Sequence, residues 1–459
     1  MHFKQLGIIA CACVALAGAW GEAPQFKAGD RVCFVGDSVT HVGSYHTQIL
    51  LFYVTRHPEM RIKTWNRGIG GDFAGGCVKR YSWDVAPCMP TVCTISVGGN
   101  DVNRPLYGAD KSGKEVEERR QKAINNSIGN MEKFVEQLSK DGVGVIIMTP
   151  TLIDETGTQK FDKQPGVNGA LKAIAEAERQ IAGKYKCGIV EWNAPMEAIN
   201  KEWQAKDPNF TVVGYDRIHP APPGYLVMAY LFLKAQGVSP TVAAMEIDAM
   251  KGVATKQENC EISKLSASSG KVAFTCLEKA LPFPVDDAAA KALELVPFTE
   301  DLNQETLKVS GLPEGQYELL IDGASVMKAS SEELLVGVNL ATVKGTPQLK
   351  QAQKAQAIIK ERAAVEQKSR IFAEAEHKLL KNLKERSPEG DRKAIEDKLA
   401  LLKSGTGENP KYYIRLYESY LKQLPEKESL ERSADELLDK AYAASLPVPH
   451  TFELRPLGK

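Results

Sequence analysis

Between residues 30 and about 238, continuous apolar runs alternate with amphipathic stretches. The clearest amphipathic stretch runs from Glu115 to Lys140, where apolar side chains recur at the spacing of a helix. Apolar strands separated by helices are typical of a parallel sheet that is covered on both faces. The expected strands are Arg31–Val35, Ile62–Trp65, Val92–Val97, Val143–Thr149 and Gly188–Trp192. The pattern therefore predicts an α/β fold with a mainly parallel five-stranded sheet.

The chain of 459 residues is too long for one ordinary hydrophobic core, so we expect two or three domains. The α/β pattern occupies residues 24–238. Residues 239–345 carry short strand signals and turns, and Pro313-Glu314-Gly315 between two β-rich runs predicts a hairpin turn. Residues 346–459 are rich in Lys, Glu, Ala and Leu, which predicts three or four helices with solvated charged faces. A partner-binding surface on these helices is the alternative interpretation.

The N-terminus resembles an export signal. An apolar run from Leu6 to Ala19 follows a single lysine, and it is shorter than the roughly 20 residues that span a bilayer. Ala17-Gly18-Ala19 supplies a cleavage motif, so we expect residues 1–23 to be a signal peptide and the protein to be periplasmic or secreted. Lipoprotein anchoring at Cys11 is the alternative, but the apolar stretch before this cysteine is short. No later segment predicts an integral membrane span.

Seven of the nine cysteines follow the expected signal peptide. An exported chain can form disulfides, and an odd number leaves at least one thiol free. We expect a Cys260–Cys276 bridge first and a Cys77–Cys88 bridge second. The remaining three cysteines lie in apolar runs that are typical of the core: Cys33, Cys93 and Cys187. No pair has the spacing of zinc ligands, so the sequence predicts no metal site.

Four stretches bring polar chemistry to one edge of the predicted sheet. Gly36-Asp37-Ser38 follows the first strand, "NRGIGGDFAGG" (66–76) the second and "SVGGNDVNR" (96–104) the third, and "YDRIHPAPPGY" (215–225) precedes a helical run. Ligands of parallel sheets bind at the carboxyl ends of the strands. The four stretches together supply a serine, a glycine-rich loop, an asparagine, an aspartate and a histidine. These are the parts that an acyl-transfer site needs.

The same stretches resemble the four blocks of the SGNH (GDSL-type) hydrolases, namely GDS, N-x-G-x-x-G, GxND and DxxH, in the family's order. The resemblance covers roughly residues 30–238. It implies a three-layer α/β/α, flavodoxin-like hydrolase domain, here followed by a small β-rich region and a helical C-terminal region. Val39 stands where many members of the family have leucine, a common substitution.

The resemblance also implies a role for each matching residue. Ser38 would be the nucleophile and His219 the base, and Asp216 would orient and stabilise the imidazolium. The oxyanion hole would consist of the backbone N–H groups of Ser38 and Gly71 and the side-chain amide of Asn100. No cofactor is implied.

The expected substrate follows from the loops and from the family. The loops after the strands are short, and no long apolar segment suggests a lipid lid, so a small acyl group is favoured, acetyl above all. Similarity to bacterial carbohydrate O-acetylesterases implies an acetylated carbohydrate or glycan. The alternatives are a lysophospholipase or thioesterase, and a glycan-binding or surface-assembly protein with a vestigial hydrolase domain.

Equal numbers of basic and acidic residues, 58 of each, argue against a nucleic-acid partner. The sequence predicts no oligomeric state.

Overall fold

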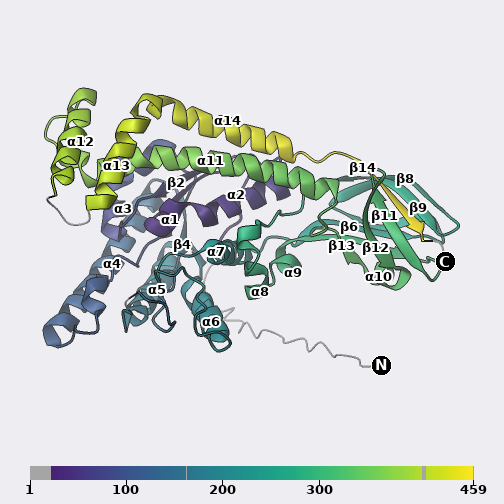
Figure 1. Ribbon diagram of the computed structural model, residues 1–459, viewed down its shortest axis with the longest axis horizontal. Coiled ribbons are helices and arrows are strands. Elements are labelled where there is room, and N and C mark those ends of the chain that lie inside the picture. The colour runs from purple at the N-terminus through teal and green to yellow at the C-terminus, as the bar shows by residue number, and fades with distance from the viewer. Residues whose placement is uncertain (1–21, 162, 406–409, 458–459) are drawn as a thin grey trace.

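The computed structural model describes residues 22–161, 163–405 and 410–457. Almost all of the expected signal peptide therefore lies outside the described residues. The α/β part lies at one end of an elongated molecule and the β-rich region at the other, and long C-terminal helices extend between them (Figure 1).

A five-stranded sheet forms the centre of the α/β part. Its strands are β1 (Arg31–Gly36), β2 (Lys63–Gly68), β3 (Val92–Ser96), β4 (Gly144–Met148) and β5 (Gly188–Val190). Their order is β2-β1-β3-β4-β5, and every neighbouring pair is parallel. The prediction of a parallel five-stranded sheet is thus confirmed. The chain continues to one side of β1 through β2 and then to the other side through β3, so the carboxyl end of β1 lies at a topological switch point.

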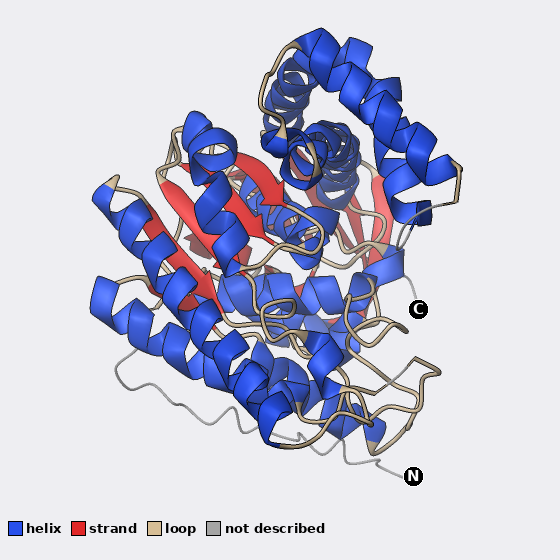
Figure 2. Ribbon diagram, turned by 90° about the vertical axis from the view of Figure 1, so that its left-hand side faces the viewer, coloured by secondary structure: helices blue, strands red, loops and turns tan. Residues whose placement is uncertain are grey.

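Helices cover both faces of this sheet, which gives three layers (Figure 2). One face carries α2 (Ser44–Arg56), α6 (Asn193–Gln204) and α7 (Pro222–Ala235). The other face carries α3 (Ala74–Arg80), α4 (Lys114–Lys140) and α5 (Val167–Tyr185). Strand β1 serves both cores, because Val32 and Phe34 pack with α2 and α7 while Cys33 and Val35 pack with the opposite helices. This double burial explains the uninterrupted apolar run in the sequence.

The β-rich region consists of two sheets around a shared apolar core. The first sheet contains β13 (Val338–Asn339), β10 (Gln304–Ser310), β6 (Thr241–Asp248) and β7 (Val253–Glu258), in that order. The second contains β12 (Ala324–Ser330), β11 (Gln316–Ile321), β14 (His450–Pro456), β9 (Lys271–Glu278) and β8 (Cys260–Ser268). The short helix α10 (Ser331–Val336) packs on this core, whereas the short helices α8 (Ala292–Leu295) and α9 (Phe298–Leu302) pack against α7 of the α/β part.

Two expectations for the second half of the chain need correction. The turn at Pro313-Glu314-Gly315 does not form a hairpin, because β10 before it and β11 after it belong to different sheets. The hairpin is β11–β12, which turns at Asp322 and Gly323. A Pro-x-Gly sequence indicates a turn, but it does not indicate whether the two strands that flank the turn pair with each other. The last region is also not wholly helical, since it ends in β14, which pairs with β9 and β11.

The expected disulfides are absent from the structure, in which all seven cysteines after residue 22 are buried free thiols. Cys260 lies opposite Glu278 in the β8–β9 ladder and Cys276 lies opposite Ile262, so the two cysteines are diagonal neighbours. The sequence predicted that two neighbouring strands carry these cysteines, but it did not predict the register of the two strands, which places the cysteines two positions apart. The expectation of a Cys260–Cys276 bridge is therefore wrong for this structure, and so is that of a Cys77–Cys88 bridge.

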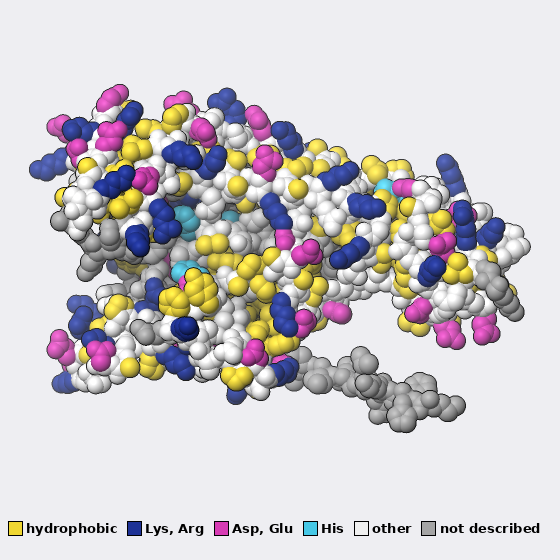
Figure 3. All heavy atoms as spheres, viewed as in Figure 1, with side chains coloured by type: hydrophobic (Ala, Val, Ile, Leu, Met, Phe, Trp, Pro, Cys, Tyr) yellow, Lys and Arg dark blue, Asp and Glu magenta, His cyan; other side chains and the backbone are white. Residues whose placement is uncertain are grey.

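The described residues of the C-terminal part contain four α-helices: α11 (Pro347–Lys378), α12 (Pro388–Lys403), α13 (Pro410–Gln423) and α14 (Lys427–Ser445). At 1.5 Å per residue, the 32-residue α11 is about 48 Å long. It extends from the β-rich region to the α/β part, with α14 alongside (Figure 1). The molecular surface is hollowed between these helices and the α/β part, and histidine side chains are visible there (Figure 3). No helix among the described residues is long and apolar enough to cross a membrane.

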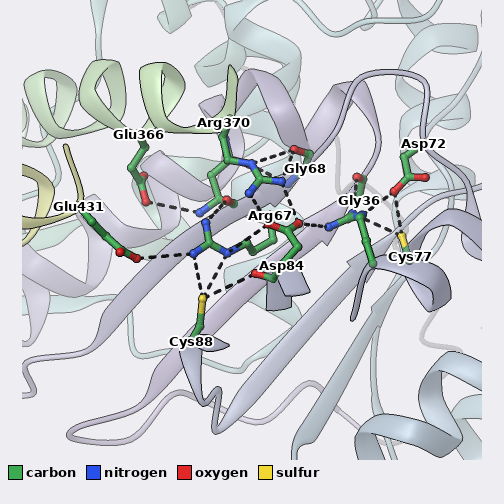
Figure 4. Close-up of polar contacts among 12 residues, drawn as sticks. Gly36, Arg67, Gly68, Asp72, Cys77, Asp84, Cys88, Glu366, Arg370 and Glu431 are labelled. Carbon is green, nitrogen blue, oxygen red and sulfur yellow. Dashed lines mark hydrogen bonds and ion pairs between the residues drawn. The ribbon is translucent and has the colours of Figure 1, made fainter. Parts of the chain in front are cut away.

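A buried network of charges fastens α11 to the α/β part (Figure 4). Arg370 forms two hydrogen bonds with the Asp84 carboxylate, at 2.6 and 3.0 Å, and donates two more to the carbonyl of Gly68. Arg80 pairs with Asp84 at 2.6 Å and with Asp72 at 2.7 Å. Burial opposes ionisation of Asp84, but the charges of Arg370 and Arg80 outweigh it and hold the pKa of Asp84 well below its usual range. The charged side chain of Arg370 in α11 is therefore buried and paired, whereas the sequence predicted that the charged faces of the C-terminal helices would be solvated.

Candidate active site

The turn after β1 presents Ser38 at the carboxyl edge of the sheet. Ser38 begins the short helix α1 (Ser38–Val42), and the Asp37 carboxylate caps this helix by accepting a backbone hydrogen bond of 2.9 Å. Glycine is required at position 36, because a Cβ atom there would lie 2.2 Å from the Thr40 hydroxyl oxygen. The tight strand-to-helix turn thus follows directly from the Gly-Asp-Ser sequence.

A chain of hydrogen bonds joins Ser38, His219 and Asp216, although Ser38 and His219 are 181 residues apart. Ser38 Oγ lies 2.7 Å from His219 Nε2, and His219 Nδ1 lies 2.6 Å from Asp216 Oδ2. The other Asp216 oxygen accepts the backbone N–H groups of His219 and Ile218. Burial opposes ionisation of Asp216, but these hydrogen bonds outweigh it and lower the pKa to about 2. The ionised carboxylate holds a proton on Nδ1, which leaves Nε2 free to accept the hydroxyl proton of Ser38.

The structure brings Asn100 to the same edge of the sheet. Its side-chain amide donates a hydrogen bond of 2.9 Å to the carbonyl of Asp72 and a long one of 3.5 Å to the Asp37 carboxylate. Its carbonyl oxygen accepts a hydrogen bond of 3.3 Å from Arg104. The amide plane is therefore fixed, while one of its N–H groups is only weakly engaged.

Gly71 lies in the turn after β2, two residues beyond Ile69. The turn is closed by a backbone hydrogen bond of 3.1 Å from Asp72 to Ile69. Gly71 is exposed and has a φ of +72°, a conformation that favours glycine. The sequence expectation placed this residue in an oxyanion hole, and its exposed position beside Asp72 is compatible with that role.

Two carboxyl groups, those of the buried Asp37 and the half-buried Asp101, support the loops. Asp101 accepts a backbone hydrogen bond of 3.0 Å from Ala74 and another of 3.0 Å from Gly98, and it thereby joins the loops after β2 and β3. Burial raises the pKa of Asp101 to about 6 and that of Asp37 to about 7. Both groups accept hydrogen bonds from backbone N–H groups, and Asp37 thereby stabilises the turn that carries Ser38.

Sequence reasoning missed the contribution of α11 and α13. Gln367 of α11 donates hydrogen bonds to the carbonyl groups of His41 and Val42 in α1, the helix that Ser38 begins. Arg370, one turn later, holds the carbonyl of Gly68 at the end of β2. The C-terminal part thus contacts both the nucleophile turn and the strand that leads into the Gly71 loop.

The same two helices crowd that loop. A Cβ atom at Gly70 would lie 2.9 Å from the carboxylate of Glu374 and 3.2 Å from the hydroxyl of Tyr412, which hydrogen-bond to each other. The ammonium group of Lys378 lies 3.5 Å from the Cβ position of Gly71. No local motif marks these residues, because they occur in a charged helical segment 300 residues further along the chain.

Comparisons with known proteins identify the family. The family model of GDSL-like lipases and acylhydrolases matches residues 34–227. The solved structure of BT4096, a gut microbial diltiazem-metabolizing enzyme, is similar over 96% of this chain and 100% of its own, with 35% identity and a TM-score of 0.86. The chain belongs to the GDSL-like lipase/acylhydrolase family. It is a carboxylic ester hydrolase, and the similarity to BT4096 includes the β-rich and C-terminal helical parts.

A second relative of this GDSL hydrolase is an acetylxylan esterase of Geobacillus stearothermophilus. The two are 24% identical over 228 residues, which are 46% of this chain and 96% of the relative. Its crystal structure covers 47% of this chain at 22% identity, with a TM-score of 0.39. Within the described parts of the GDSL hydrolase, no group of three or more His, Cys, Asp and Glu side chains is arranged to hold a metal ion.

Proposed function

We propose that this hydrolase is a serine esterase in which Ser38 attacks the ester carbonyl. His219 takes the hydroxyl proton and later returns it to the leaving alcohol, and Asp216 stabilises the imidazolium formed in between. The hydrogen-bonded chain from Ser38 through His219 to Asp216, with contacts of 2.7 and 2.6 Å, is the observation that carries the proposal. Water then hydrolyses the acyl-enzyme by the same proton route.

The backbone N–H groups of Ser38 and Gly71 and the amide of Asn100 would stabilise the oxyanion. The Asn100 amide supports this role because its contact with Asp37 is long, so that one N–H is available to the developing charge while the amide stays hydrogen-bonded to the carbonyl of Asp72. One such donor contributes about 3 kcal/mol to transition-state stabilisation.

An O-acetyl group on a carbohydrate or glycan is the substrate we propose. An acetylxylan esterase is among the relatives, and the short loops after the strands favour a small acyl group. BT4096 is named for the metabolism of a drug, so a broader range of acetylated alcohols is compatible with this architecture. The apolar run and cleavage motif at the N-terminus support export to the periplasm or beyond.

An acetate-release assay over acetylated xylo-oligosaccharides, sialic acids and peptidoglycan fragments tests the substrate class, with p-nitrophenyl acetate, butyrate and palmitate as a chain-length series. We expect acetate release from at least one glycan, and kcat/KM that falls steeply with chain length. A preference for palmitate would favour the lysophospholipase or thioesterase alternative. A folded protein that hydrolyses none of these esters would favour the binding role. The Ser38→Ala variant serves as the blank.

A further inference from the structure

Two aromatic side chains stand exposed beside the proposed catalytic residues. The side chain of Tyr215 is 76% exposed and that of Phe161 is 51% exposed, and their ring centroids lie 5.5 Å apart. Tyr215 directly precedes Asp216 and so lies on the loop that carries His219, whereas Phe161 lies on the loop after β4. Paired aromatic rings that remain open to solvent are a feature of ligand sites, because such rings are otherwise packed in the core.

The buried Arg217 fixes this pair in place. Its side chain donates to four carbonyl groups of the loop after β4, namely those of Asp154, Gly157, Gln159 and Phe161, at 2.5 to 3.1 Å. Arg217 is only 2% exposed, so these bonds are shielded from water. The position of Phe161 is therefore set by a residue that lies between Asp216 and His219 in the sequence.

The backbone of Arg217 adds a second constraint. Its carbonyl accepts a hydrogen bond of 2.9 Å from Asp154, so that the two loops are joined through both main chain and side chain. The φ of Arg217 is +71°, which L-residues rarely adopt and which persists only where the surroundings impose it. Such strain at a residue inside the DxxH block indicates that the loop pairing serves the site.

The expected reaction chemistry indicates which part of the ester lies near Phe161 and Tyr215. The proposed base His219 must reach the oxygen of the leaving alcohol, whereas Asn100 and Gly71 face the carbonyl oxygen. Tyr215 lies on the His219 loop, and so the alcohol part of the ester is the part that extends toward the aromatic rings.

We propose that Phe161 and Tyr215 form a leaving-group subsite that takes a ring, either a pyranose or an aryl ring, with one face against the aromatic pair. The location of this subsite rests on the proposed function. A flat ring face buries more apolar area against Phe161 and Tyr215 than an open chain does, and aromatic pairing adds specificity. The hydrolase would therefore select cyclic alcohols over acyclic ones with the same acetyl group.

The test compares kcat/KM for three acetates: mono-acetylated methyl β-xyloside, benzyl acetate and the open-chain 2-methoxyethyl acetate. In Phe161→Ala and Tyr215→Ala we expect the ratio of cyclic to open-chain kcat/KM to fall by about threefold to tenfold each. Tyr215→Phe, which keeps the ring, should retain most of the ratio. Met250→Ala removes an exposed apolar side chain of the β-rich region and should leave the ratio unchanged. A fall for the xyloside alone identifies a sugar subsite, and a fall for benzyl acetate alone identifies an aryl subsite.

A second readout does not depend on catalysis. Ligand-observed NMR measures how methyl β-xyloside and benzyl alcohol bind to the Ser38→Ala protein. We expect the binding of both ligands to weaken when Phe161→Ala and Tyr215→Ala are added to this variant. If the wild-type protein hydrolyses no acetate, the proposed function fails and this binding result still decides on the subsite. A folded Phe161→Ala/Tyr215→Ala double variant that changes neither the ratio nor the binding would overturn the subsite.

Discussion

At the scale of single residues, Asn100 tests the proposed oxyanion site. Its weakly engaged N–H would bind the negative charge that develops on the carbonyl oxygen, and would contribute little to binding of the neutral substrate. We expect Asn100→Ala to lower kcat by about 10²–10³ and to leave KM nearly unchanged. Asn100→Asp should be at least as harmful, because a carboxylate repels the oxyanion. Steady-state kinetics with p-nitrophenyl acetate provide the measurement.

A purely structural role of Asn100 gives a different pattern. The amide also holds the carbonyl of Asp72, so a structural residue would show its loss in thermal stability rather than in kcat. If Asn100→Asp recovers activity, the oxyanion assignment is wrong. Melting temperatures of both variants complete the comparison.

The sequence predicted which residues would meet at this candidate site, and their roles stay a prediction, but it could not predict their surroundings. Gly36, Ser38 and the Asp216–His219 pair occur in short motifs whose spacing reflects local backbone geometry. Arg217 lies within one of these motifs, but its clamp on a loop about 60 residues earlier depends on tertiary structure.

At the scale of elements, α11 is a structural support for the site. Replacing Arg370 with methionine would leave the Gly68 carbonyl without its side-chain donor and the buried Asp84 with fewer cations. We expect Arg370→Met to lower the free energy of unfolding by about 3–5 kcal/mol, the range for breaking a buried ion pair. Arg392→Met removes an exposed pair with Glu396 and should cost less than about 1 kcal/mol. Urea unfolding of both variants makes the comparison, and equal costs would contradict a supporting role for α11.

The parallel sheet was predictable because its strands are buried on both faces and therefore read as continuous apolar runs. Helix α11 was recognisable as a helix, but its buried Arg370 and Glu374 resemble solvated charges in the sequence. Strand β14 was missed because "HTFELRP" is a single short run that follows four helices. Its partners β9 and β11 lie more than 100 residues earlier, so no local pairing signal existed.

At the scale of the whole molecule, the junction of the β-rich region with α11 buries two carboxyl groups. Glu278 accepts a hydrogen bond of 2.8 Å from Gln348 of α11, whereas neither side-chain oxygen of Glu305 has a hydrogen-bond partner among the described residues. Burial raises the pKa of Glu278 to about 8, and burial with the nearby Glu278 charge raises that of Glu305 well above its usual range. Both groups therefore keep their protons to a higher pH in the folded protein than in the unfolded chain.

This burial makes stability dependent on pH. Between the ordinary carboxyl pKa of about 4.3 and the raised folded values, the folded chain binds more protons than the unfolded chain, so stability falls as pH rises. We expect a lower melting temperature at pH 9 than at pH 6, and Glu305→Gln should narrow that difference. Glu261→Gln, an exposed change in β8, is the control. A difference that Glu305→Gln leaves unaltered would show that this carboxyl group is not the cause.

The most direct measurement of the proposed mechanism is kcat/KM for p-nitrophenyl acetate in Ser38→Ala, His219→Ala and the double variant. Because Ser38 and His219 would act as one unit, each single change should remove nearly all activity, and the double variant should be no less active than either. Circular dichroism and melting temperature verify that each variant is folded. A folded Ser38→Ala protein that keeps more than about a tenth of the wild-type value would contradict the serine-esterase mechanism.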